Sequence, residues 1–214
     1  ETQVSYPIHR VMWKDGLYEN IKGAIQGGRF AGAPFFTEAD VGGAGLLRRQ
    51  CTREFKIQPI TRKLRELVGL KYRQRAPKRV IIKQYIGISL DEAIRMKPSR
   101  EKWIEHTWPL VDLGMRRLDC LQWMDKHGYP RPKKSSCTFC PYHGNDEWRY
   151  LRDNSPEGWQ QAIEVDKMIR SGVRGTTQRL FVHRDMVPLE EADLDSATNQ
   201  LDMFGEECEG MCGV

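Results

Sequence analysis

The chain has 214 residues, of which 39% are hydrophobic and 29% charged, and its formal net charge is +5. This size and composition fit one globular domain with a tail, and no stretch approaches the roughly 18 apolar residues that a membrane-spanning helix needs. Because the first residues are polar rather than signal-like, we expect a cytoplasmic protein that contacts no membrane. In that reducing compartment the 6 cysteines favour metal binding or redox chemistry over a disulfide framework.

Hydrophobic periodicity predicts the elements of the first part of the chain. In order, we expect an edge strand over residues 6–12, a helix over 17–26, a glycine-rich loop over 31–46 and a second helix over 52–70. Pro59 should kink or restart the second helix, because its ring blocks the normal backbone hydrogen bond. The clearest strand covers residues 80–89, and its near-continuous apolar character predicts a central, buried position.

Helices and extended segments also alternate in the second part of the chain. A short helix is expected near Asp91, followed by an extended segment over residues 103–111 that Pro109 breaks. An amphipathic helix over residues 118–127 and two more helices over 146–151 and 156–171 come next. Cys120 lies in the amphipathic helix and should be a buried thiol. The alternation predicts an α/β fold with a parallel twisted sheet and flanking helices. We place this domain at residues 1–171 and a loop-rich extension with a cysteine tail at residues 172–214.

The spacing of the cysteines is the strongest functional signal. Cys137 and Cys140 form a Cys-x-x-Cys knuckle, with His143 just after it and Cys51 far upstream. The four residues could complete a Cys₃His zinc site, while the three cysteines alone could hold three irons of a 4Fe–4S cluster. Structural cysteines without a metal are the remaining interpretation.

Cys51 begins a basic helix. The positive end of the helix dipole favours the thiolate, which is the form that binds metal, and Arg53 and Lys56 act in the same direction. The same basic groups could instead hold a phosphate or a sulfate.

The end of the predicted strand at residues 80–89 is a second candidate site. Ligands of α/β sheets bind at the carboxyl ends of the strands. Gly87 permits close backbone approach, Ser89 offers a hydroxyl group, and Arg95 and Arg100 offer positive charge for phosphates. An ordinary strand-to-helix turn is the alternative interpretation.

Cys208 and Cys212 lie in a C-terminal segment rich in Glu and Gly. Such a segment buries little surface, so we expect a mobile tail. Its acidic neighbours should raise the pKa of both thiols, and docking against a basic cleft would reverse that effect. The two cysteines are candidates for a nucleophile or a persulfide carrier, and incidental cysteines in a disordered end are the alternative.

Four motifs in this order resemble the phosphoadenylyl-sulfate (PAPS) reductase-like family of the PP-loop, or adenine nucleotide α-hydrolase, superfamily. The family's Cys-Cys-x-x-x-Lys-x-x-Pro-Leu and Thr-Gly-x-Arg-x-x-Glu-Ser segments are similar to residues 51–60 and 86–95. Its Pro-Leu-x-Asp-Trp segment, Cys-x-x-Cys knuckle and Glu-Cys-Gly tail are similar to residues 108–113, 137–141 and 207–210. The resemblance therefore covers the middle of the chain and the tail.

The resemblance implies a 4Fe–4S cluster on Cys51, Cys137 and Cys140, and an adenine nucleotide or adenylylated substrate at the strand end. A single cysteine, Cys51, stands where the family has Cys-Cys, so only three cysteines would bind the cluster. This is similar to related tRNA-thiolating enzymes, in which the iron without a cysteine ligand would hold a sulfide. The family's Ser-Gly-Gly-x-Asp-Ser nucleotide loop is absent from this sequence.

Together these features predict a sulfur-handling enzyme domain that reduces a sulfonucleotide or thiolates a tRNA or DNA, with a thiol reductant or sulfur donor as partner. The phosphates of the substrate would contact Arg53, Lys56, Arg95 and Arg100. The tail cysteines would act as the nucleophile. The alternative is a non-catalytic zinc-knuckle module that binds nucleic acid through its basic face.

Overall fold

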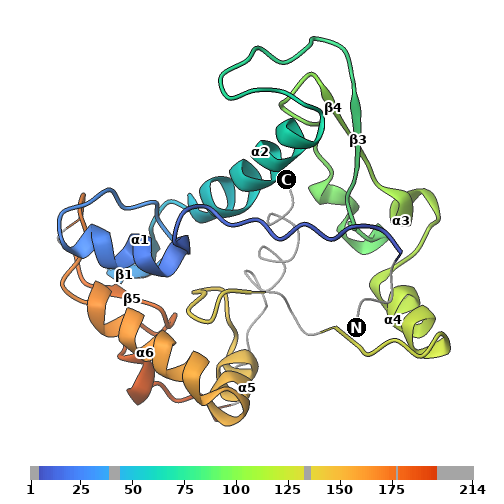
Figure 1. The fold of residues 1–214 in the computed structure, drawn as a ribbon. Helices are drawn as coiled ribbons and strands as arrows, with labels where there is room; N and C mark the ends of the chain where they lie inside the picture. Colours follow the sequence, from blue (N-terminus) through green and yellow to red (C-terminus); the bar gives the residue numbers. More distant parts are fainter. Residues whose placement is uncertain (1–4, 39–43, 133–135, 177, 197–214) are drawn as a thin grey trace.

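Two groups of elements, connected through helix α2 (Gln58–Leu67), make up the fold (Figure 1). The first group contains α1 (Gly16–Ile25), β1 (Phe36–Glu38), β2 (Ala44–Leu46), α5 (Asn145–Asn154), α6 (Pro156–Ile169), β5 (Leu180–Phe181) and the short 3₁₀ helix η3 (Leu189–Glu191). The second contains β3 (Ile82–Tyr85), the 3₁₀ helix η2 (Leu90–Arg95), β4 (Ile104–Thr107), α3 (Pro109–Asp112) and α4 (Arg117–Lys126). A π-helical segment, η1 (Thr52–Ile57), leads from the first group into α2. The structure is a computed structural model that describes residues 5–38, 44–132, 136–176 and 178–196.

The main cluster of buried hydrophobic residues lies in the first group. Helix α6 packs on α1, α5 and β5, and its buried apolar residues are Ala162, Ile163, Val165 and Ile169. The sheet has the order β2-β1-β5 and is antiparallel, with Phe36 opposite both Leu46 and Phe181. The Tyr18 hydroxyl of α1 donates a hydrogen bond to the Glu164 carboxylate of α6 at 2.5 Å. The core therefore joins the two ends of the described chain.

A buried carboxylate on α6 holds the segment that follows β5. Asp166 is 1% exposed, and its two oxygens accept hydrogen bonds from the backbone N–H groups of Val182 (3.0 Å) and Leu189 (3.1 Å). Arg170, one turn later on α6, forms an ion pair with the same carboxylate. Since a buried N–H group without an acceptor costs about 1–3 kcal/mol, Asp166 fixes the path of residues 182–189.

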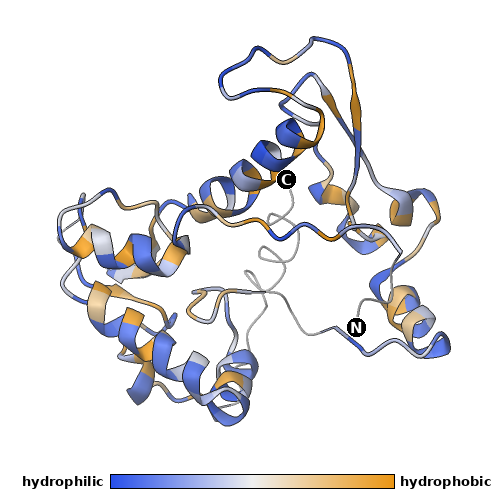
Figure 2. Cartoon of the chain, in the orientation of Figure 1, coloured by the Kyte–Doolittle hydropathy of each residue, from blue (hydrophilic) through white to orange (hydrophobic). Residues whose placement is uncertain are grey.

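The second group contains a two-stranded parallel sheet, in which Ile82 of β3 lies beside Ile104 of β4. The predicted central, buried position is wrong for the strand itself, because no residue of β3 is buried and Tyr85 is 71% exposed, whereas Ile86 and Ile88 after the strand are buried. Figure 2 shows hydrophobic residues in both strands, and no third strand pairs with them among the described residues. A strand is buried only when layers cover both of its faces, and the second group contributes no residue to the core cluster of the described chain.

The mixed α/β class is confirmed, and Pro59 acts as predicted. Pro59 is the second residue of α2, where the chain passes from π-helical to α-helical turns. Gly27, with φ of +86°, follows the end of α1. The extended segment predicted at residues 103–111 ends earlier than expected, because Pro109 begins α3. Residues 6–12 run as irregular chain where a strand was predicted, since no described strand pairs with them.

Helix α4 forms where an amphipathic helix is predicted, but it lies outside the core. All of its residues are described and none of them is buried, with Leu118 62% exposed. The prediction of a buried Cys120 is therefore wrong, because that thiol is only half-buried. Partial burial, with Asp119 and Asp91 nearby, still raises the pKa of the Cys120 thiol. The helix is held at its start, where Arg117 N–H donates to the Asp91 carboxylate (2.6 Å).

The segment after residue 171, predicted as a loop-rich extension, shares the core with α6. Strand β5 pairs with β1, and the buried residues of this segment include Leu180, Val182, Leu189 and Leu194. Residues 197–214, which carry both tail cysteines, lie outside the described residues. Among the helices that the structure describes, none combines the length and the apolar character needed to cross a membrane.

Candidate metal centre and phosphate-binding residues

The predicted knuckle is a tight turn anchored in the core. Cys140 N–H donates to the Cys137 carbonyl oxygen (3.1 Å), and Phe139 between them is buried in the core cluster. The Thr138 hydroxyl donates to the side-chain oxygen of Gln161 on α6 at 2.5 Å. Both thiols are half-buried. The turn therefore holds two sulfur atoms in fixed positions at the edge of the core.

His143 follows the knuckle and is 6% exposed. Its backbone N–H donates to the Cys140 carbonyl oxygen (3.1 Å), and its Nε2 lies 2.8 Å from the Ser136 hydroxyl. Its ring meets Trp148 edge-on, with 4.5 Å between the ring centroids. These contacts fix the base of the turn. The role of His143 as a zinc ligand stays a prediction.

Cys51 stands where the π-helical segment η1 begins, and its thiol is half-buried. The Cys51 N–H donates to the Gly32 carbonyl oxygen (3.1 Å), which also accepts the N–H of Gln50 (2.8 Å). A Cβ atom at Gly32 would lie 3.0 Å from the Arg48 carbonyl oxygen, so a residue without a side chain lets the two segments approach. The start of the helix is thereby tied to the loop that precedes β1.

The two cysteine-bearing segments meet through a cation–π contact. The guanidinium carbon of Arg49 lies 5.3 Å from the centroid of the Tyr142 ring. Arg49 comes shortly before Cys51 and Tyr142 shortly after Cys140. The structure thus brings Cys51 into the neighbourhood of a knuckle that is far away in sequence.

No group of three or more His, Cys, Asp or Glu side chains within the described residues is arranged as a metal site. Cys208 and Cys212 lie outside those residues, so no contact is assigned to them. The 4Fe–4S cluster and the zinc site therefore stay predictions, based on the chemical identity of the cysteine and histidine side chains.

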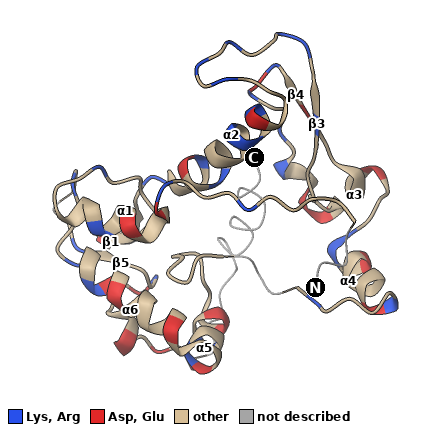
Figure 3. Cartoon of the chain, viewed as in Figure 1, with Lys and Arg blue, Asp and Glu red and all other residues tan. Residues whose placement is uncertain are grey.

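The predicted phosphate-binding residues fall into two groups. Arg53 and Lys56 lie on η1, where Arg53 is exposed and Lys56 is half-buried. The others follow β3 in the second group of elements: Gly87, Ser89, Arg95 and Arg100. Figure 3 shows that basic residues continue along α2 and the loop after it.

The end of β3 combines open backbone with a buried hydroxyl. A Cβ atom at Gly87 would meet no atom within 4 Å among the described residues, so the backbone is open to a ligand there. Ser89 is 5% exposed and precedes η2 in an extended conformation. Arg95 forms an ion pair with Glu92 at 2.6 Å, while Arg100 is exposed. Arg95 is therefore held by a carboxylate in this structure, and its role toward phosphate stays a prediction.

Sequence reasoning missed a polar pair that positions the segment after the knuckle. Asn145 and His183 are both buried, and His183 Nε2 donates to the Asn145 side-chain oxygen at 3.1 Å. Asn145 Nδ2 donates to the Asp193 carbonyl oxygen (3.1 Å), and Asp185 N–H donates to His183 Nδ1 (3.3 Å). The ring is therefore neutral and uses both nitrogens. In the sequence, the only indication of this pair is Asn145 at the expected start of a helix, directly after His143-Gly144. This pattern does not identify His183 as its partner.

Burial lowers the pKa of His183, and the charge of Arg184 acts in the same direction, while Asp185 and Asp166 oppose it. The unfolded chain therefore binds the proton first as the pH falls. We expect the free energy of unfolding to be fully retained above about pH 6.5, the ordinary value for histidine, and to decrease below it by at most about 1.4 kcal/mol per pH unit. Urea denaturation at a series of pH values measures this slope.

The variant His183→Gln removes the titrating ring and keeps an N–H donor for Asn145, so its stability should depend less on pH. His127→Gln, at the exposed end of α4, is the matched control. Equal slopes in the wild type and in His183→Gln would contradict the assignment.

Neither protein-family models, nor curated proteins, nor solved structures give a match to this chain.

Proposed function

We propose that this chain is a sulfur-handling enzyme domain of the PAPS reductase-like type, with an iron–sulfur cluster on Cys51, Cys137 and Cys140. The observation that carries the proposal is the contact of Arg49 with Tyr142, because it brings together the segments that hold the three cysteines. Nothing in the local sequence requires those segments to meet.

The donor set fits a soft metal centre. Thiolates are the ligands of iron–sulfur clusters, and all three thiols are half-buried rather than exposed. The core fixes the knuckle through Phe139 and Thr138, and the Gly32 carbonyl fixes the start of η1. A bound cluster would supply a redox-active iron site.

The adenine nucleotide or adenylylated substrate belongs, in this proposal, at the carboxyl end of β3. The open backbone at Gly87 and the hydroxyl of Ser89 support this position, since ligands of parallel sheets bind at strand ends. Arg100 is exposed there and would neutralise phosphate, with Arg95 available if Glu92 releases it. Arg53 and Lys56 supply positive charge on η1.

The parallel pairing of β3 and β4 supports a PP-loop type of fold. Parallel sheets are normally covered on both faces, yet no residue of β3 is buried and its Tyr85 is largely exposed. An uncovered parallel pair of this kind is typical of strands that belong to a larger parallel sheet.

The proposed reaction is sulfur transfer to a nucleic acid or reduction of a sulfonucleotide, with Cys208 or Cys212 as nucleophile and a thiol or sulfur donor as co-substrate. The single cysteine at position 51 favours sulfur transfer, because a cluster with three protein thiolates keeps one iron accessible.

Metal analysis after anaerobic purification tests the centre. We expect iron and acid-labile sulfide with the visible absorbance of a cluster in the wild type. Cys51→Ser and Cys137→Ser should each lose most of the iron, because each removes a thiolate ligand. Cys120→Ser is the matched control, since that thiol lies on α4 away from the centre, and it should keep the iron.

A colourless wild type with stoichiometric zinc would overturn the cluster and favour the zinc-knuckle module. Equal iron in Cys120→Ser and Cys137→Ser would show that the knuckle is no ligand.

A further inference from the structure

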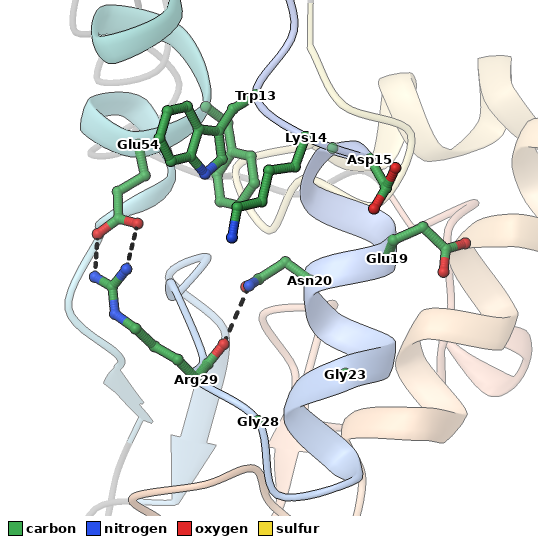
Figure 4. Close-up of a pocket in the computed structure, with 11 residues that line it drawn as sticks. Trp13, Lys14, Asp15, Glu19, Asn20, Gly23, Gly28, Arg29 and Glu54 are labelled. Carbon is green, nitrogen blue, oxygen red and sulfur yellow. Dashed lines mark hydrogen bonds and ion pairs between the residues drawn. The ribbon is translucent and has the colours of Figure 1, made fainter. Parts of the chain in front are cut away.

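A cavity of about 330 Å³ lies beside η1, between this segment and the start of α1 (Figure 4). It contains none of the residues predicted above to bind metal or phosphate. Its lining includes Trp13, Lys14, Gly28, Arg29, Glu54 and Phe55. The volume is at the lower end of the range of small-molecule sites, roughly 300–1,000 Å³.

Two aromatic side chains form the apolar part of the cavity. Trp13 comes from the loop before α1 and Phe55 from η1, so the two are brought together only by the fold. The Arg62 guanidinium of α2 lies 4.3 Å from the centroid of the Trp13 ring and fixes the orientation of the indole. Neither aromatic residue belongs to the core cluster of the described chain, so packing of the core does not explain them.

The opposite wall is bare backbone. Gly28 N–H donates to the Gly23 carbonyl oxygen at 2.8 Å, and a Cβ atom at Gly28 would lie only 2.6 Å from that oxygen. A side chain is therefore excluded at Gly28. Aromatic faces on one side and flat backbone on the other suit a planar ring.

The cavity lining contains two cations, Lys14 and Arg29, and three carboxylates, those of Asp15, Glu19 and Glu54. Arg29 donates to both carboxylate oxygens of Glu54, so this pair neutralises itself. The Lys14 amine extends into the cavity, and no ion pair holds it among the described residues (Figure 4). The carboxylates of Asp15 and Glu19 point away from this side. One cation therefore remains for a phosphate next to the ring.

Lys14 has a left-handed backbone conformation, with φ of +46°. Such a conformation is uncommon for residues other than glycine, and it is often found where a side chain is held for function. The turn places Lys14, which is an exposed residue, in the lining of the cavity.

The surface next to the cavity is basic. Arg53 and Lys56 flank Glu54 and Phe55 in sequence, and Arg62 follows on α2. A row of cations beside an aromatic pocket is the arrangement that proteins use for single-stranded nucleic acid, in which phosphates follow the cations and bases stack on the rings.

We propose that this cavity, the Trp13–Phe55 pocket, holds one unpaired base of a single-stranded nucleic acid whose phosphates lie along Lys14, Arg53 and Lys56. Cys51 begins the same helical segment that carries Phe55, so the strand passes close to the proposed sulfur centre. The inference deepens the proposed function by naming its acceptor class, and Gly87, Ser89 and Arg100 remain for the adenine nucleotide.

Fluorescence anisotropy with a labelled single-stranded oligonucleotide tests the pocket. Trp13→Ala should weaken the affinity by roughly 5- to 150-fold, the usual range for the loss of one stacked base. Trp13→Phe keeps a ring and should lose much less. Trp123→Ala removes an indole that is 48% exposed on α4, and it should leave the affinity unchanged.

Lys14→Gln supplies a second measurement that does not depend on the ring. It should weaken binding and lower the slope of log K against log salt by about 1, the value for one phosphate contact. Unchanged affinity in Trp13→Ala, equal losses in Trp13→Ala and Trp123→Ala, or equal affinity for a duplex of the same sequence would overturn the proposal. Equal affinity for a free mononucleotide would overturn it as well.

These binding measurements need no metal, so their failure is distinguishable from failure of the cluster. Cys51→Ser should lose iron and keep its affinity for the oligonucleotide.

Discussion

Asp166→Ala should lower the free energy of unfolding by about 3–5 kcal/mol, the usual cost of removing one partner of a buried ion pair. The change leaves the N–H groups of Val182 and Leu189 without their acceptor and Arg170 without its counter-charge. A typical domain is stable by only about 5–15 kcal/mol, so much of the stability would be lost. Urea denaturation followed by circular dichroism measures the effect.

Two further variants define the cause of this loss. Asp166→Asn keeps one acceptor oxygen and should show an intermediate loss. Asp125→Ala removes an ion pair with Arg131 in which both side chains are well exposed, and it should change the stability far less. Similar stabilities for Asp166→Ala and Asp125→Ala would contradict the role assigned to Asp166.

Trp148→Ala should cost about 3–5 kcal/mol, because it empties a large volume in the core. Trp148 is 0% exposed and its ring meets both His143 and Trp159. Loss of the ring also removes the support of His143 at the base of the knuckle. We therefore expect the folded fraction of this variant to retain less iron than the wild type.

Trp148→Phe tests the packing alone. The Trp148 indole N–H has no hydrogen-bond partner among the described residues, so phenylalanine loses volume alone and should cost less than alanine. Trp123→Ala, on the exposed side of α4, should shift the unfolding midpoint little. Equal midpoints for Trp148→Ala and Trp123→Ala would show that Trp148 does not support the core.

The elements set by local chemistry were predictable from sequence. Gly27 ends α1 and Pro59 sits at the start of α2, because the backbone of each residue limits what its neighbours can adopt. The exposure of β3 was not predictable, since the side chains of a strand, such as Tyr85, are buried only if other layers cover them. The same reason explains Cys120, whose helix has the right pattern and no covering element among those described.

The candidate site was predictable in its residues but not in its arrangement. The spacing of Cys137 and Cys140 specifies a tight turn, which the structure contains. Its proximity to Cys51 depends on the contact of Arg49 with Tyr142, which no local pattern encodes. The low aromatic content of 9% gave no indication of stacking surfaces, because Trp13 and Phe55 become neighbours only in the folded chain.

The hydrogen bond between Tyr18 and Glu164 spans 146 residues, and this distance determines the order of events during synthesis. At about 5–20 residues per second, a ribosome needs about 7–30 s to complete the partner of α1. Throughout that time the apolar side chains of Ile21 and Phe35 have no core to enter. Contacts between such distant residues also form slowly, because a long loop must close first. The last quarter of the chain therefore sets the moment at which the first quarter becomes structured.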